Sequence, residues 1–155
     1  MATRKINKVH RQDGLAIVEL TLTLPLLLLL LLVTMEFGRA FMQYNTLTKS
    51  VRDSVRYVAS NALLGQTGTI QLNAQLVSEA QNLVAYGSIA AAGNTALIPG
   101  LSPGQVTVAA AGPEDISVLA TYPYQPMFLV LSGFGLGPDR SSLYTFRAQA
   151  TMRAL

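Results

Sequence analysis

Apolar residues are concentrated near the start of the chain, where residues 15–35 form a run of 21 residues with one ionisable side chain, Glu19. The residues in front of this run are polar and basic. At about 1.5 Å per residue, a helix over the run measures roughly 32 Å, enough to cross the hydrocarbon core of a bilayer. The pattern predicts a transmembrane helix at residues 15–35, preceded by an irregular leader peptide at residues 1–14.

Two residues interrupt the apolar run. Glu19 carries a carboxylate, and burying an ionised group in lipid is costly enough that such a residue should pair with another group or mark a function. Pro25 removes one backbone hydrogen bond, which a membrane helix tolerates, and it predicts a kink. The kink either lets the helix bend when the chain leaves the bilayer or is passive, and the sequence leaves both readings open.

Gly14 lies directly in front of the apolar run and is a candidate processing site. If the peptide bond after Gly14 is cut, Leu15 becomes the new amino terminus and Glu19 the fifth residue of the shortened chain. The Glu19 carboxylate can then pair with the terminal ammonium of a neighbouring copy. A secretory signal peptide requires a shorter core followed by small residues, and residues 34–37 offer no Ala-x-Ala site. An uncleaved signal anchor remains the alternative.

Beyond the run, apolar positions recur at alternating steps of four and three residues, as on one face of a helix. This seam consists of Phe37, Phe41, Tyr44, Thr48, Val51, Val55, Val58 and Ala62. We expect the helix to continue outside the membrane over residues 36–64 and to stop at Gly65. The seam is covered either by the chain's own C-terminal part or by other subunits. Glu36 and Arg39, three residues apart, either form an ion pair or dock a partner.

Residues 65–155 predict a small α+β head. Helical spacing predicts a second helix at residues 73–86, whereas residues 87–104 are rich in Gly, Ala, Asn and Pro and are typical of a loop. Alternating apolar positions predict three strands, at residues 105–110, 116–124 and 143–152. We expect these strands to form a short antiparallel sheet packed on the long helix. The apolar residues 127–131 either join the core or form an exposed lip beside the membrane or a partner.

Charge is distributed unevenly along the chain. The formal net charge is +3, and residues 1–14 account for all of it. Because positive residues favour the cytoplasmic side of a membrane, we expect a cytoplasmic N terminus and a translocated head. The rest of the chain is neutral in sum, so it lacks the net basic field expected of a nucleic-acid-binding protein.

Residues typical of catalysis or of metal binding are scarce. The one histidine, His10, lies in the leader, and the absence of cysteine excludes disulfides and thiolate metal sites. Glu114 and Asp115 are adjacent in a predicted turn and are more typical of solvated charges than of a calcium site. The glycine-rich residues 133–138 lack the lysine and the following helix of a phosphate-binding loop. We therefore expect no enzyme activity, no metal site and no cofactor.

The apolar run and its flanks resemble a known family. The strings that carry the resemblance are GLAIVEL at residues 14–20, LPLL at 24–27 and MEFGRA at 35–40, with a further likeness in ATYPY at 120–124 and AQATMR at 148–153. The basic leader, Gly14 and Glu19 together resemble the class III signal of type IV pilins and pseudopilins. The fuller pattern is dense over residues 12–60 and resembles the TadE-like pseudopilins of the tight-adherence system, also called the Flp or type IVc pilus system.

This resemblance implies a role and a set of partners. A prepilin peptidase would cut after Gly14, and the protein would lie in the bacterial inner membrane with its head in the periplasm, or enter the pilus. It would be a minor pseudopilin that supports pilus assembly, adhesion and biofilm formation. The implied partners are the membrane, the prepilin peptidase, other pseudopilins, the major Flp pilin and the inner-membrane assembly platform. The alternative is an uncleaved single-span anchor whose head is a binding module of the cell envelope.

Overall fold

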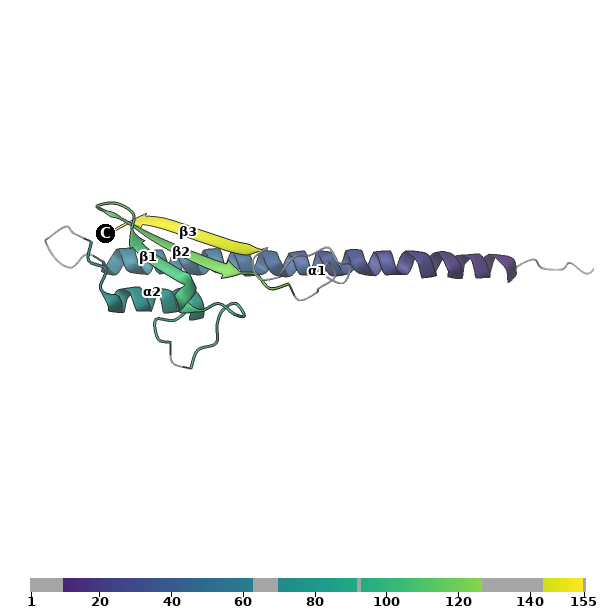
Figure 1. Ribbon diagram of the computed structural model, residues 1–155, viewed down its shortest axis with the longest axis horizontal. Helices are drawn as coiled ribbons and strands as arrows, with labels where there is room; N and C mark the ends of the chain where they lie inside the picture. Colours follow the sequence, from purple (N-terminus) through teal and green to yellow (C-terminus); the bar gives the residue numbers. More distant parts are fainter. Residues whose placement is uncertain (1–9, 63–69, 92, 127–143, 155) are drawn as a thin grey trace, which may run out of the picture.

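The computed structural model describes residues 10–62, 70–91, 93–126 and 144–154. Figure 1 shows a long helical rod with a small head packed along its C-terminal half. The elements, in chain order, are α1 (His10–Asn61), α2 (Ala74–Tyr86), the 3-10 turn η2 (Pro103–Gln105), β1 (Val106–Ala110), β2 (Asp115–Pro123) and β3 (Thr145–Arg153). The expected α+β arrangement of a long helix, a second helix and a three-stranded antiparallel sheet is confirmed.

Helix α1 has 52 residues, which corresponds to about 78 Å. It begins at His10, so the expectation of an irregular leader is wrong for residues 10–13. Adding residues to a helix costs little once the helix is nucleated. The helix formed by the apolar run therefore extends backward by about one turn into the polar residues before it. The helix is continuous through Pro25 and ends at Asn61. Gly65, the expected stop, lies outside the described residues.

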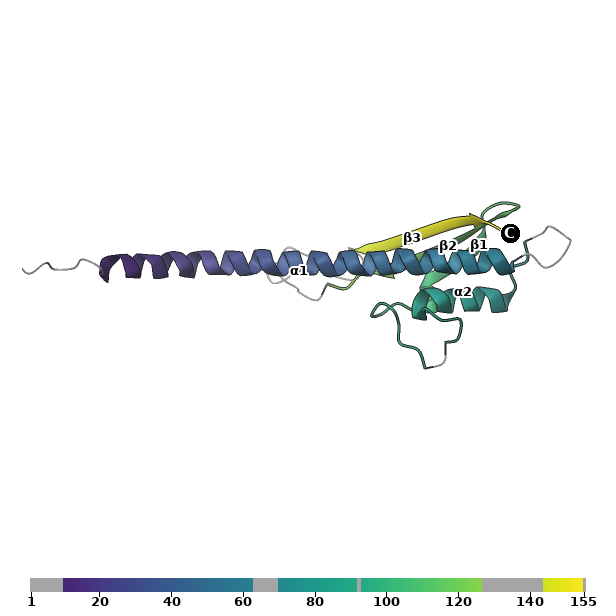
Figure 2. The ribbon, with the colours of Figure 1, turned by 180° about the vertical axis from the view of Figure 1, so that it is seen from behind.

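The N-terminal half of α1 lies largely outside the described part of the head. Within the described residues, α1 is the one helix long and apolar enough to cross a membrane, and its most apolar window is not buried by the rest of the protein. Figure 2 shows this half projecting well beyond the sheet and α2. A helix with so much exposed apolar surface requires a nonpolar environment, as a bilayer provides.

The sheet has the order β1-β2-β3, and both pairs of strands are antiparallel. β2 lies in the centre, and its register runs from Ile116 opposite Ala110 to Ala120 opposite Val106 on the β1 side. On the other side it pairs with β3 along its whole length, from Asp115 opposite Arg153 to Pro123 opposite Thr145. Every second side chain of β2 is buried, as a strand with one face on a core requires.

Helix α2 is bounded by two capping residues that the sequence supplies. The Asn73 side chain accepts a hydrogen bond from the Leu76 backbone N–H at 2.6 Å and so caps the N terminus. Gly87 follows the last turn in the left-handed region, with φ of 71°, and its N–H donates to the Leu83 carbonyl. Where α2 crosses α1, the fully buried Ser54 hydroxyl donates to the Ala80 carbonyl at 2.9 Å.

The core lies between the C-terminal half of α1, helix α2 and the inner face of the sheet. Its largest fully buried side chains are Leu47, Ile98, Ile116, Val51, Val55, Val58, Val84 and Val118. The outer part of the predicted seam, from Val51 to Ala62, is therefore covered by the chain's own head. Its inner part is not covered, because Phe37 and Phe41 are 75% and 60% exposed. The apolar residues 127–131 lie outside the described residues.

Candidate functional site

The predicted processing site is accessible in this structure. Gly14 lies within α1, with no neighbouring atom within 4 Å of the position that a Cβ would occupy. Leu15, which would become the amino terminus after cleavage, is exposed. The side of Gly14 on which a side chain would project is therefore open, and cleavage itself stays a prediction.

Glu19 lies one helical turn further along α1 and faces outward. Within the described part of the chain, no hydrogen bond or ion pair engages its carboxylate. Its backbone carbonyl accepts a hydrogen bond from the Thr23 hydroxyl at 2.9 Å. A carboxylate on the lipid-facing surface of a membrane helix is unfavourable on its own, so Glu19 requires a partner from outside this part of the chain or a position near the membrane surface.

Threonine residues before and after Pro25 in α1 donate hydrogen bonds from their hydroxyl groups to backbone carbonyls. Thr21 donates to the Ile17 carbonyl at 2.7 Å, and Thr34 donates to the Leu30 carbonyl at 2.8 Å. These bonds keep the polar threonine side chains satisfied inside an apolar segment, and bonds of this kind tend to loosen the helical ladder. Because Pro25 also lacks an N–H, residues 21–25 form the locally weakest part of the span. The predicted kink stays a prediction.

The most densely connected polar group of the protein lies where α1 leaves the predicted span. Arg39 Nη2 donates to Glu36 Oε1 at 2.6 Å, which confirms the predicted ion pair. The same Nη2 donates to the backbone carbonyl of Gln125 at 2.7 Å, and the guanidinium lies 5.1 Å from the centroid of the Tyr124 ring. The Tyr124 hydroxyl donates to Glu36 Oε1. We call Glu36, Arg39, Tyr124 and Gln125 the junction cluster, because it joins α1 to the end of β2.

The environment of Tyr124 keeps its hydroxyl protonated. Burial raises its pKa, and the hydrogen bond to Glu36 raises it further, against the opposing effect of Arg39, so that the pKa reaches about 12. The ring also stacks beside Phe146, with 5.0 Å between the centroids. At neutral pH Tyr124 is therefore a permanent hydrogen-bond donor to the Glu36 carboxylate.

The sequence predicted Glu36 and Arg39 as a site but missed Tyr124 and Gln125. One signal was available. Tyr124 continues the two-residue alternation of Ile116, Val118, Ala120 and Tyr122, which places it on the face of the sheet that packs against α1. What the alternation does not show is which turn of a 52-residue helix lies opposite, because that depends on the register of the sheet along α1.

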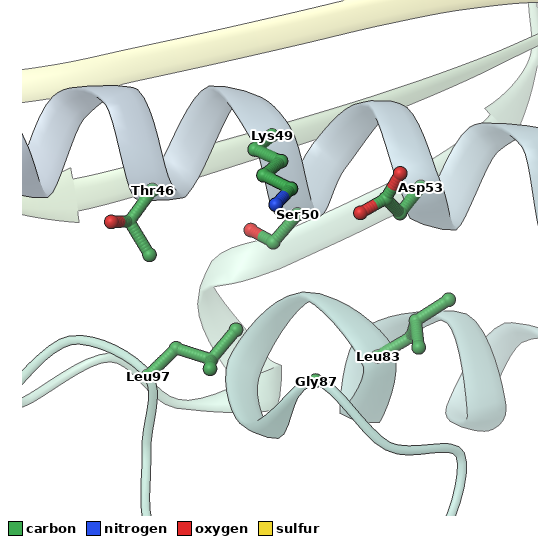
Figure 3. Close-up of a pocket in the computed structure, with 7 residues that line it drawn as sticks. All are labelled: Thr46, Lys49, Ser50, Asp53, Leu83, Gly87 and Leu97. Atoms are coloured by element: carbon green, nitrogen blue, oxygen red, sulfur yellow. The ribbon is translucent and has the colours of Figure 1, made fainter.

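The described surface of the head includes a larger and a smaller hollow. The larger, about 330 Å³, lies between α1 and the C-terminal end of α2 and is lined by Thr46, Lys49, Ser50, Asp53, Leu83, Gly87 and Leu97. Figure 3 shows the side chains of α1 facing Leu83 and Leu97 across this groove. The smaller, about 230 Å³, adjoins the junction cluster at Arg39 and Gln125. No group of three or more potential metal ligands occurs among the described residues.

The comparisons with known proteins agree with this geometry. Residues 14–56 match the profile of a family described as TadE-like protein. Neither the curated proteins nor the solved structures gave a match to the chain. TadE-like proteins are structural components of the Tad pilus system and not enzymes, so the match indicates involvement in that system. Residues 14–56 therefore match the TadE-like family, which confirms the resemblance found in the sequence.

Proposed function

We propose that this protein is a minor pseudopilin of the tight-adherence pilus, made as a precursor and cut by a prepilin peptidase after Gly14. The observation that carries the proposal is the position of the family match, which begins at Gly14 and runs along α1 through its apolar half into the half that the head covers. The exposed Gly14 backbone and the outward-facing Glu19 support it. In this proposal residues 1–14 are the leader, residues 15–35 the span and residues 65–155 the periplasmic head.

Glu19 has a defined role in this proposal. Cleavage creates an ammonium group at Leu15, and the carboxylate of Glu19 on a neighbouring subunit neutralises it inside the membrane or a helical bundle. Two charges that are each costly in lipid become one neutral pair. The pair forms in full only when one subunit is in step with the next, so it sets the axial position of a newly added helix.

The proposed partners follow from the same assignment. They are the prepilin peptidase, other pseudopilins, the major Flp pilin and the inner-membrane platform, with Glu36 and Arg39 as a possible docking point for the platform. The junction cluster limits the docking role of Glu36 and Arg39, because the head of the same chain already binds both side chains. Support of adhesion and biofilm formation would follow from the pilus that the protein helps to build.

The first test is the N-terminal mass of the protein purified from membranes of cells with and without a prepilin peptidase. We expect a chain beginning at Leu15 with the enzyme and an uncut chain without it. An uncut chain in the presence of active enzyme would overturn the proposal and favour the uncleaved envelope anchor.

A second test separates the role of Glu19 from cleavage. We expect E19Q to insert into the membrane and to be processed normally but to lose incorporation and pilus assembly, because it cannot neutralise the ammonium group. The matched control is E19D, which keeps the charge and should retain at least part of the assembly. Normal pilus numbers in E19Q would contradict the role proposed for this carboxylate.

A further inference from the structure

The surface of α1 stays uncharged beyond the predicted end of the span. Between Arg39 and Lys49 the helix carries no acidic or basic residue. Phe37, Phe41 and Met42 lie in this region or beside it, and they are 75%, 60% and 72% exposed. At about 1.5 Å per residue, the uncharged segment from residue 40 to residue 48 covers roughly 13 Å of the helix. If this segment lay fully outside the membrane, these three apolar side chains would be exposed to water.

The two charged residues just before this segment, Glu36 and Arg39, are held in a polar cluster with the head. The Glu36 and Arg39 side chains are only 17% and 28% exposed, and they pair with each other. Arg39 also binds the Gln125 carbonyl, and Glu36 accepts the Tyr124 hydroxyl. A paired and hydrogen-bonded set is far less costly to bring to the edge of the hydrocarbon than two separate charges. The junction cluster therefore does not hold this part of α1 away from lipid.

The end of the head beside the junction cluster is also suited to a lipid surface. Tyr124 and Tyr144 meet there, because the Tyr124 N–H donates to the Tyr144 carbonyl at 2.7 Å. Tyr144 is exposed, and no charged residue occurs at residues 118–126 or 144–146. Tyrosine is enriched at membrane–water interfaces, where its ring and its hydroxyl are both accommodated.

The cost of placing the Glu19 carboxylate in lipid determines how far the helix is shifted along the membrane normal. Before cleavage the new ammonium group does not exist, so the carboxylate has no such partner in the uncut chain. Residues 20–39 are 20 residues long and measure about 30 Å as a helix, the same as a hydrocarbon core. If the membrane covers this segment, Glu19 lies at the cytoplasmic surface instead of inside lipid.

We infer that in the uncut chain the hydrocarbon core covers residues 20–39 and not residues 15–35, so that the junction cluster lies at the outer edge of the hydrocarbon and the adjoining part of the head lies in the headgroup layer. The partner is the lipid surface, and the contacts are made by Phe41, Met42 and Tyr144. This inference rests on α1 spanning a membrane and does not depend on cleavage or on pilus assembly. If the proposed function is refuted, this inference is unaffected, and a refutation of this inference leaves the proposed function unaffected.

Tryptophan substitution provides the test, because the chain contains no tryptophan of its own. The variants are F41W, L24W as a probe inside the span in either position, and R52W as a probe in water. Arg52 is exposed and lies three turns beyond Phe41 on nearly the same side of α1. Each full-length variant is produced without a prepilin peptidase and reconstituted in phosphatidylcholine vesicles, with and without bromine atoms near the top of the acyl chains.

The two positions of the helix give different results for F41W. With the core at residues 20–39, this side chain lies about 3 Å beyond the hydrocarbon, and we expect a blue-shifted emission with strong loss of intensity in brominated vesicles. With the core at residues 15–35, it lies about 9 Å beyond, outside a headgroup layer of roughly 5–8 Å, and its emission should match that of R52W. That match would overturn the inference. A blue shift without bromine quenching that fades as the protein is diluted in lipid would also overturn it, because a second copy would then cover Phe41.

Discussion

Replacing Tyr124 by phenylalanine isolates the hydrogen bond that holds the head against α1. The Y124F variant keeps the ring, which lies beside Phe146 and within 5.1 Å of the Arg39 guanidinium, and removes the hydroxyl that donates to Glu36. Hydrogen bonds to charged groups contribute about 1.5–3 kcal/mol, so we expect the free energy of unfolding of the head to fall by about that amount. The loss should be at the upper end, because Glu36 is left partly buried with one donor fewer.

Tyr122 provides a matched control two residues earlier on the same face of β2. Its hydroxyl donates to the neutral Pro99 carbonyl at 2.9 Å, so Y122F should cost only about 0.5–1.5 kcal/mol. Both free energies can be measured in detergent micelles by pulse proteolysis over a urea series, which reports unfolding of the head while the N-terminal half of α1 stays helical in the micelle.

A double-mutant cycle with E36Q tests the pair directly. We expect the losses of Y124F and E36Q to be clearly non-additive, with a coupling free energy of about 1 kcal/mol or more. Losses that simply add, or equal losses in Y124F and Y122F, would refute the conclusion that the bond from Tyr124 to Glu36 fastens the head to the helix.

Three further predictions concern the head and use the same unfolding measurement. L47A removes a fully buried side chain and should cost about 2–5 kcal/mol, whereas L26A, on the exposed surface of the span, should change the value by less than about 0.5 kcal/mol. The Tyr57 hydroxyl donates to the Glu79 carboxylate, and this bond lowers the pKa of Glu79 below 4.5 and raises the pKa of Tyr57 above 10.0. Its contribution should therefore be complete between these values, disappear as pH falls through the lowered pKa of Glu79 or rises through the raised pKa of Tyr57, and be absent at every pH in Y57F. G87A forces a Cβ into a left-handed residue with φ of 71° and to within 3.3 Å of a leucine side chain, so it should cost about 1–2 kcal/mol.

The secondary structure of the head was predictable because its periodicities are strong and local. The alternation along β2 specifies a strand with one buried face, and the capping asparagine and glycine specify both ends of α2. The outer seam of α1 was predictable for the same reason, since the recurrence of Val51, Val55 and Val58 on one face requires a cover. In each case the sequence within a few residues determines the local conformation.

The contacts of the candidate site were not predictable in the same way. Gln125 meets Arg39 across 86 positions of the chain, and no local pattern relates the two. The seam shows the same limit, because Phe41 and Val55 occupy equivalent positions in the repeat, yet one is exposed and the other is buried. Periodicity identifies an apolar face, but the length and placement of the head decide how far along the helix that face is covered.

Helix α1 therefore has two halves whose apolar surfaces are satisfied in different ways. The C-terminal half buries its seam under the head, so its stability belongs to the chain itself. Among the described residues, the head does not bury the most apolar window of the N-terminal half, so that surface needs lipid or neighbouring helices to cover it. The junction cluster lies at the boundary between the two halves. A force applied to the N-terminal half is therefore transmitted to the head first at Glu36 and Arg39 and only then to the core at Leu47. If a helix of this kind leaves the bilayer for a filament, the junction cluster keeps the orientation of the head fixed while the surroundings of the N-terminal half are exchanged.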